Sequence, residues 1–208
     1  MIPTGIALTV VGCAALLVAE RRRTGWRVLA KLVASTGFLV VALDGGVEGP
    51  YAIWILVGLG LSWVGDAALL GRSDTAFLIG LVAFLLGHVA YVIAFASLPP
   101  DASPVAFGLA AVWLVAAGVI SRWLLPVVDG SMRVPVGAYI AVITVMVVLS
   151  GGAGAAASDV RIPIGAVLFG ISDIAVARDR FVAPGWSNRV WGLPLYYAGQ
   201  LLLALTVG

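Results

Sequence analysis

The sequence predicts an all-α integral membrane protein, a polytopic bundle of eight transmembrane helices that forms a single domain over residues 1–208. Hydrophobic residues make up 62% of the chain before its 26 glycines are counted, whereas a soluble domain reaches roughly 45–50% with glycine included. Charged residues make up 11%, against about 25% in soluble proteins. So few polar side chains cannot cover a water-exposed surface, which argues against a soluble globular enzyme. Eight helices of about 20 residues each also leave no room for a soluble domain.

Apolar runs between helix-breaking residues define the eight expected spans. The runs cover residues 3–19, 26–43, 51–70, 76–97, 104–125, 133–150, 161–177 and 190–207. A proline lacks the N–H that a helix interior needs, so prolines favour helix ends. We expect eight of them at span edges, and only Pro194 lies well inside a span; the eight are Pro3, Pro50, Pro99, Pro100, Pro104, Pro135, Pro163 and Pro184.

The positive charges are distributed unevenly between the two sets of loops. Alternate loops carry ten arginines, whereas the opposite loops carry only Arg161. Loops rich in Lys and Arg remain in the cytoplasm. We therefore expect a protein integral to the cell (inner or plasma) membrane. The loops after the first, third, fifth and seventh spans should lie in the cytoplasm, and both termini on the non-cytoplasmic side. The ten arginines are Arg21, Arg22, Arg23, Arg27, Arg72, Arg122, Arg133, Arg178, Arg180 and Arg189.

Two spans resemble each other. Residues 58–70 read GLGLSWVGDAALL and residues 165–177 read GAVLFGISDIAVA, with Gly58 aligned on Gly165 and Asp66 on Asp173. The offset equals four spans, so a duplication would give a parallel repeat about an axis along the membrane normal. Chance similarity between helices rich in Gly, Ala and Leu is the alternative. A duplication predicts that the two aspartates lie at similar depth.

A few polar residues lie inside the expected spans, although an ionisable group there costs at least about 2.5–3.5 kcal/mol. At ~1.5 Å per residue, Lys31, Asp66 and Asp173 lie roughly 6–8 Å below the cytoplasmic boundary. His88 and Tyr91 lie near mid-membrane. Five spans thus offer polar groups to one cavity that opens toward the cytoplasmic leaflet, and the remaining candidates are Ser62, Ser172, Tyr196, Tyr197 and Gln200.

Each of these residues also has a structural interpretation. Lys31 can extend to the lipid headgroups, the aspartates can cap helix ends or bind loop arginines, and His88 can form a hydrogen bond between helices. The tyrosines suit an aromatic belt, and the serines suit close helix packing. Their convergence on one region favours a functional cavity over a set of unrelated structural roles.

Other kinds of chemistry have little support in the sequence. Hydrolase, metalloprotease and phosphate-loop motifs are missing. With one histidine and only Cys13, which lies in an apolar run, we expect no metal, no other cofactor and no disulfide. The remaining chemistry is that of the carboxyl pair Asp66 and Asp173. Two carboxyls close together in low dielectric cannot both ionise easily, so such a pair supplies a general acid and a general base.

The sequence resembles the YhhN-like lysoplasmalogenase family, which includes the animal transmembrane alkenylglycerophospholipid hydrolases. The resemblance covers nearly the whole chain, through the segments WRVLAKL, GLGLSWVGDAALL, FLIGLVAFLLGHVAYVIAF, YIAVITVM, GAVLFGISDIAVARDRF and YYAGQLLLAL. One departure is Leu32, where the family usually has a proline. The resemblance implies eight helices and cleavage of the vinyl ether bond of lysoplasmalogens, which yields a fatty aldehyde and a glycerophospho-base.

Under this resemblance one of Asp66 and Asp173 protonates the vinyl ether, while the other stabilises the cation and activates water. Lys31 is expected near the lipid phosphate, and the other polar candidates position the enol ether and water. The expected partners are the lysophospholipid, water and membrane lipids, with no nucleic acid. The alternative is a small lipid or solute transporter, or a lysolipid-binding protein, that uses the same polar cavity; a purely structural subunit is disfavoured by the intramembrane charges.

Overall fold

The computed structural model describes residues 1–71 and 73–208, and these residues form eight α-helices and no strand. The all-α class expected from composition is therefore confirmed. A single 3₁₀ turn, η1 (Leu125–Val127), follows α5, and a π turn, η2 (Arg178–Val182), follows α7. The helices are α1 (Ile2–Arg22), α2 (Arg27–Asp44), α3 (Gly49–Ala68), α4 (Asp74–Ala96), α5 (Pro104–Leu124), α6 (Gly130–Ala157), α7 (Arg161–Ala177) and α8 (Trp186–Ala204).

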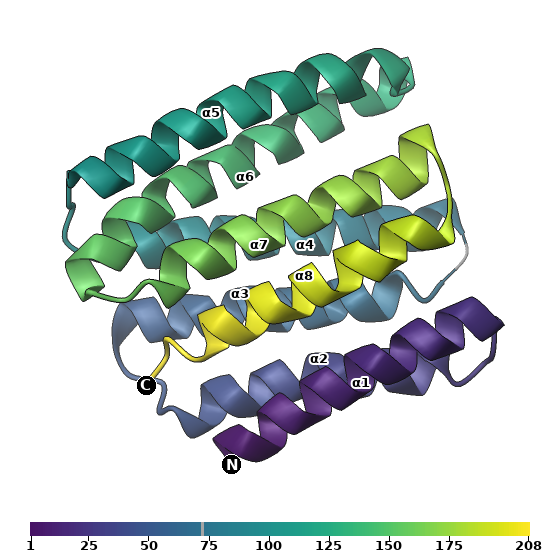
Figure 1. Ribbon diagram of the computed structural model, residues 1–208, viewed down its shortest axis with the longest axis horizontal. Coiled ribbons are helices and arrows are strands. Elements are labelled where there is room, and N and C mark those ends of the chain that lie inside the picture. Colours follow the sequence, from purple (N-terminus) through teal and green to yellow (C-terminus); the bar gives the residue numbers. More distant parts are fainter. Residues whose placement is uncertain (72) are drawn as a thin grey trace.

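The helices pack as four antiparallel hairpins, each made of two helices that are consecutive in the chain. Figure 1 shows the α7–α8 hairpin in front of the α3–α4 hairpin, with α1–α2 along one edge and α5–α6 along the other. The last helix, α8, contacts α1, α2 and α3 in addition to α7. It therefore occupies the centre of one half of the bundle, where its polar residues face several helices at once.

Each expected span overlaps one helix, and the largest difference is in α6. This helix begins at Gly130 and ends at Ala157, whereas we expected residues 133–150. Pro135, expected at a span edge, lies inside α6, and Pro194 lies inside α8. In α6 the proline is the sixth residue, so it lies beyond the first turn and removes one backbone hydrogen bond of the helix.

Five of the helices, α1, α3, α4, α5 with η1, and α6, are long and apolar enough to cross a membrane. The other three are shorter or more polar. Helix α7 has 17 residues, and the 18 residues of α2 include Arg27, Lys31 and Asp44. These three helices carry six of the ten polar site candidates: Lys31, Ser172, Asp173, Tyr196, Tyr197 and Gln200.

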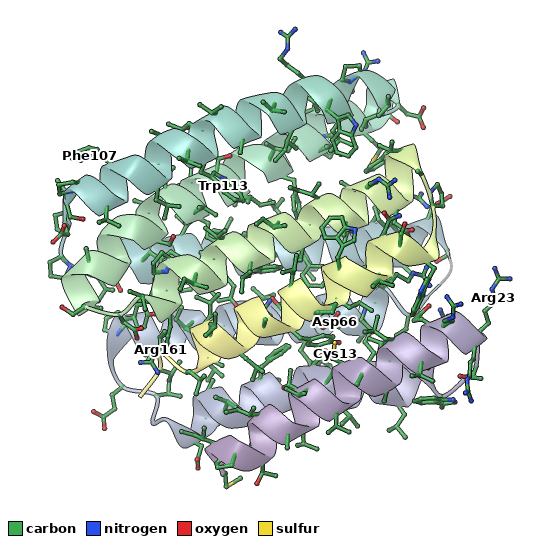
Figure 2. All side chains as sticks on the ribbon, viewed as in Figure 1. Cys13, Arg23, Asp66, Phe107, Trp113 and Arg161 are labelled. Atoms are coloured by element: carbon green, nitrogen blue, oxygen red, sulfur yellow. The ribbon has the colours of Figure 1, made fainter. Side chains whose placement is uncertain are left out.

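The outer surface of the bundle is apolar. On α5, the residues Val105, Phe107, Val112 and Val115 are each at least 65% exposed, and Figure 2 shows Phe107 at the edge of the molecule. Exposed apolar patches on soluble monomers rarely exceed a few hundred Å². A helix surface of this kind suits contact with lipid chains, and the protein is an integral membrane protein.

The two ends of the bundle carry different charges. Figure 2 shows Arg23 and Arg161 at opposite ends, and Figure 1 shows both termini at one end. The terminal amine forms an ion pair with Asp44 at 2.8 Å. The loops that carry nine of the ten counted arginines lie at the other end; the tenth, Arg72, falls outside the described residues.

The two glycines aligned by the internal similarity have corresponding surroundings. A Cβ on Gly58 in α3 would overlap the ring of Tyr91 in α4. A Cβ on Gly165 in α7 would overlap Leu203 and the backbone of Gly199 in α8. In each case the glycine allows close contact with the helix that follows it in the chain.

Candidate active site

A cavity of about 530 Å³ penetrates the bundle from its arginine-rich end. All eight helices contribute to its walls, which are mostly apolar. Half of the ten polar residues expected at the site line this cavity: Lys31, Asp66, Ser172, Asp173 and Tyr196. The other half do not, and they are Ser62, His88, Tyr91, Tyr197 and Gln200.

Asp66 of α3 forms a buried ion pair with Lys31 of α2. Its Oδ1 lies 3.1 Å from Lys31 Nζ, and its Oδ2 accepts hydrogen bonds from Ser35 Oγ at 2.5 Å and from Tyr196 OH at 2.7 Å. The Asp66 side chain is only 2% exposed. A buried charge needs a counter-charge and hydrogen-bond donors, and two helices, α2 and α8, supply them here. Figure 2 shows Asp66 within the bundle.

Asp173 of α7 forms a second pair, with His88 of α4. The Asp173 Oδ2 and His88 Nε2 atoms lie 3.0 Å apart. The other ring nitrogen, His88 Nδ1, lies 2.7 Å from the carbonyl oxygen of Phe84. Because a carbonyl only accepts, Nδ1 carries a proton. The close approach of Nε2 to the carboxyl is then favourable only when the pair holds a further proton, on either partner.

His88 Nε2 and Asp173 Oδ2 are close, but their relative orientation does not meet the geometry of a hydrogen bond. Neither atom has another hydrogen-bond partner among the described residues. Asp173 lines the cavity, whereas His88 is fully buried and does not. The carboxyl therefore faces the cavity and the imidazole lies behind it. Buried polar atoms left without partners are rare, so these two atoms mark an unusual point at the cavity wall.

Two aromatic rings connect the pairs. The ring of Phe169 in α7 stacks on His88 with centroids 4.2 Å apart, and it lies 5.6 Å from the ring of Tyr196. Tyr196 in turn donates to Asp66. The two carboxyls thus have separate polar partners. The ring of Phe169 lies between His88, the partner of Asp173, and Tyr196, a partner of Asp66.

The remaining polar candidates form a different cluster, deeper in the bundle. Tyr91 OH donates to Gln200 Oε1 at 2.6 Å, and Gln200 Nε2 donates to Ser62 Oγ at 2.9 Å. All three side chains are fully buried. This chain of hydrogen bonds joins α3, α4 and α8 and satisfies its members internally, so it stabilises the helix arrangement behind the site.

Two further expected residues have local partners. Tyr197 OH lies 3.3 Å from Ser35 Oγ, next to the Lys31–Asp66 pair. Ser172 Oγ donates to the carbonyl oxygen of Phe169 one turn earlier in its own helix, at 2.7 Å. Ser172 therefore lines the cavity with its hydroxyl already satisfied.

Sequence reasoning missed several residues of the site. Ser35 lies one helical turn after Lys31, a spacing that places both on one helix face, so a search of that face would have found it. Trp113 of α5 also lines the cavity, and its buried Nε1 has no hydrogen-bond partner in the part of the chain that the structure describes. The ring of Trp113 lies against Gly170 in α7, a long-range contact that no local pattern reveals.

The cavity mouth is organised by the segment between α7 and α8. Asp179 accepts hydrogen bonds from Gly185 N at 2.8 Å and Asn188 Nδ2 at 3.0 Å. Asn188 also accepts from Arg178 and donates to the carbonyl oxygen of Ala183. These bonds hold η2 and the start of α8 together beside the opening. Among the described residues, no three His, Cys, Asp or Glu side chains are grouped to hold a metal ion.

The chain is similar in sequence to several animal proteins. Lysoplasmalogenase TMEM86A of Bos taurus is 31% identical over 163 residues, which cover 76% of this chain and 66% of that protein. Lysoplasmalogenase TMEM86B of Mus musculus is 36% identical over 169 residues, which cover 81% of this chain and 70% of that protein. The chain thus spans about two thirds of the length of these relatives. No solved structure matches it. Residues 26–207 match the YhhN family, and the chain belongs to that family.

Proposed function

We propose that this protein is a membrane hydrolase that cleaves the vinyl ether bond of a lysoplasmalogen. The observation that carries the proposal is a pair of buried carboxyls in the wall of one apolar cavity, each with its own basic partner. The relatives named lysoplasmalogenase support the same substrate class. A cavity of about 530 Å³ lies within the usual range for small-molecule sites, which is about 300–1,000 Å³.

Asp173 is the proposed proton donor. A vinyl ether is hydrolysed by transfer of a proton to its β-carbon, which leaves an oxocarbenium ion. The His88–Asp173 pair holds a proton beside the cavity, and only the carboxyl lines it. In this proposal Asp173 transfers the proton to the substrate. His88, which lies on the side of Asp173 away from the cavity, positions the carboxyl and reprotonates it. A positioned acid of this kind contributes typically about 10²–10⁴-fold in rate.

Asp66 is the proposed base and cation stabiliser. It pairs with Lys31 and accepts hydrogen bonds from Ser35 and Tyr196, so its carboxyl is fixed in place before the reaction and can stabilise the oxocarbenium ion. Water adds to the carbon attached to oxygen, and Asp66 takes the water proton. As the carbon–oxygen bond of the resulting hemiacetal to the glycerol breaks, Asp66 gives its proton to the leaving glycerol oxygen. The hemiacetal hydroxyl proton returns to the His88–Asp173 pair, which releases the aldehyde and the alcohol and restores both groups. The net change is the addition of one water molecule.

We also propose that all eight helices cross the membrane, with the arginine-rich end in the cytoplasm. The grouping of both termini at the opposite end supports this orientation. Single cysteines in a Cys13→Ala background test it. A cysteine at residue 23 should react with an impermeant maleimide only after the cells are opened, and a cysteine at residue 159 should react in intact cells. The four-helix duplication stays a proposal as well, supported by the corresponding contacts of Gly58 and Gly165.

The decisive experiment is hydrolysis of lysoplasmenylethanolamine by purified protein in D₂O. Alcohol dehydrogenase in the same mixture reduces the aldehyde at once and so prevents exchange by enolisation. Proton transfer to carbon predicts one deuterium on the carbon next to the former carbonyl. The matched substrate with a saturated alkyl ether should remain intact, because it has no double bond to protonate.

Two outcomes overturn the proposal. An alcohol without deuterium at that carbon rules out carbon protonation. Binding of the lysolipid without release of aldehyde, with transfer of the intact lipid between vesicles, favours the transporter instead.

A further inference from the structure

A second, polar cavity adjoins the mouth of the first. Its volume is about 470 Å³, and we call it the arginine vestibule; its walls are formed by Glu20, Arg23, Thr24, Gly25, Arg27 and Arg189. Half of these residues, Glu20, Arg27 and Arg189, also line the central cavity. The two cavities are therefore adjacent, one mostly apolar and the other mostly polar. This division matches the two parts of a single-chain phospholipid, an apolar chain and a charged headgroup.

The guanidinium groups of the vestibule are held in place. Arg27 Nη1 lies 3.6 Å from Glu20 Oε1, and its Nη2 donates to the carbonyl oxygen of Leu70 at 3.3 Å. Arg189 pairs with Glu20 Oε2 and lies 3.7 Å from Asp179. Glu20 is 13% exposed, so it is a fixed anchor between two arginines. Its role is to aim both groups at the vestibule.

Arg23 adds a third positive charge from the end of α1. Its backbone has φ of 55°, in the left-handed region that an arginine seldom adopts. Its side chain is exposed and forms no ion pair with any residue that the structure describes. The vestibule contains three arginines and one glutamate, so its net charge is positive. Arginine binds phosphate through paired N–H groups.

We propose that the arginine vestibule binds the phosphate of the lysolipid headgroup, an assignment that rests on the proposed function. The spacing fits: Arg27 lies one helical turn, ~6 Å, from Lys31 on the same helix, and Lys31 contacts Asp66. A glycerol backbone bridges a comparable distance between the vinyl ether and the phosphate.

Lys31 is a poorer phosphate ligand than the vestibule arginines. Its ammonium is 11% exposed and is already paired with Asp66. Arg180, the other arginine at the mouth, lies outside the vestibule and pairs with Asp74 at 2.8 Å. The arginines of the vestibule are therefore the positive groups best placed to bind the phosphate.

The test compares two substrates with the same alkenyl chain, lysoplasmenylethanolamine and the phosphate-free alkenylglycerol. Arg23→Ala and Arg189→Ala should each raise KM for the phosphorylated substrate by about tenfold or more, because a charged hydrogen bond is lost. Neither variant should change kcat by more than about twofold or alter KM for the alkenylglycerol. Arg22→Ala is the matched control, since Arg22 is the last residue of α1, next to Arg23 in the chain, but lies outside the vestibule.

The source of the phosphate is tested by inhibition of the wild-type protein. Glycerophosphoethanolamine should compete with the substrate, and Arg189→Ala should weaken that competition. Equal inhibition by inorganic phosphate at the same concentration overturns the assignment to a lipid headgroup. Equal KM increases for both substrates, or a loss only in Arg180→Ala, also overturn the proposal.

Binding of a non-hydrolysable lysolipid separates this inference from the proposed function. Lysophosphatidylethanolamine with a saturated ether chain should bind the wild-type protein more tightly than Arg23→Ala or Arg189→Ala. If the protein cleaves no vinyl ether but shows this difference, the proposed function fails and the vestibule assignment stands. If cleavage occurs and the difference is missing, the reverse holds. Size-exclusion profiles in detergent establish that each variant is folded.

Discussion

His88 Nε2 lies 3.0 Å from Asp173 Oδ2, while Nδ1 of the same ring lies 2.7 Å from the carbonyl oxygen of Phe84. The carbonyl fixes a proton on Nδ1, so Nε2 and the carboxyl hold the exchangeable one. Asp66 is surrounded instead by Lys31, which forms an ion pair with it, and by Ser35 and Tyr196, which donate hydrogen bonds to it. The two carboxyls thus have different surroundings, which is the arrangement expected when one acts as acid and the other as base.

Replacement of either member of the proton-holding pair should abolish most activity. Asp173→Asn and His88→Gln keep side-chain size but remove the proton donor or its partner. We expect kcat to fall by at least about 100-fold in each, measured as aldehyde release. Asp173→Asn should show no recovery at any pH, because an amide does not titrate.

The control for these variants is Ser172→Ala. Ser172 lines the same cavity next to Asp173, but its hydroxyl donates to the backbone of its own helix. We expect its kcat to stay within about threefold of wild type. A loss as large as that in Asp173→Asn would show that the assay reports helix packing and not proton transfer.

The effects of replacing Lys31 and Asp66 on the free energy of unfolding should not be additive, because the two side chains form an ion pair. Lys31→Met leaves the Asp66 charge buried without its counter-charge, which costs about 3–5 kcal/mol. The double variant Lys31→Met, Asp66→Asn removes both charges and should recover a large part of that loss. Unfolding in mixed detergent and SDS measures the cycle. Additive single losses would mean that the two groups do not interact in the folded protein.

Close packing of α3 on α4 should depend on Gly58. A Cβ added at Gly58 would overlap the ring of Tyr91, and the Tyr91 hydroxyl donates a hydrogen bond to Gln200 Oε1 at 2.6 Å. Gly58→Ala should therefore destabilise the protein by about 1–3 kcal/mol. Gly60 in the same helix has no neighbour within 4 Å, so Gly60→Ala should be neutral or stabilising by up to about 1 kcal/mol. Equal effects of the two substitutions would contradict the packing argument.

An acid-dependent contribution to stability is expected at the terminal end of the bundle. The Arg161 side chain donates hydrogen bonds to Asp159 at 2.7–3.0 Å and holds the pKa of that carboxyl below its ordinary value of 3.8. A lowered pKa in the folded state stabilises the fold above the ordinary pKa, and the contribution is lost as the pH falls through the folded pKa. Arg161→Gln should therefore melt below wild type at pH 7, and the difference should shrink below about pH 4.

The control for this pH dependence is Arg122→Gln. Arg122 forms no ion pair with any carboxylate that the structure describes. Its melting temperature should follow that of wild type at every pH. A difference in Arg161→Gln that persists at pH 2 would mean that the arginine acts through packing and not through Asp159.

The helices themselves were largely predictable. Apolar runs define each expected span. Each segment that crosses a membrane must by itself satisfy its backbone groups and present apolar side chains to the lipid. The prediction was least accurate for α6, which extends to Ala157 through a stretch of Gly and Ala. Such residues give a weak hydropathy signal, although small residues pack well between membrane helices.

The sequence predicted which residues belong to the candidate site better than it predicted which of them contact one another. Lys31, Asp66, His88 and Asp173 stood out because charged and ionisable groups inside a span are rare. Their partners depend on how each helix is rotated and which helix lies beside it. Ser35 and Trp113 escaped notice because a serine and a tryptophan in an apolar span are common and carry no signal of their own.

The sequence by itself determined that this is an all-helical membrane protein with a few ionisable groups within its helices, since hydropathy and charge are properties of local segments. Tertiary structure alone decided that Asp66 pairs with Lys31 and Asp173 with His88. It also divided the polar residues between a cavity wall and the buried chain of Tyr91, Gln200 and Ser62. The physical reason is that hydrogen bonds and ion pairs form over about 3 Å. Contacts that short depend on helix rotation and close packing, which no one-dimensional pattern specifies.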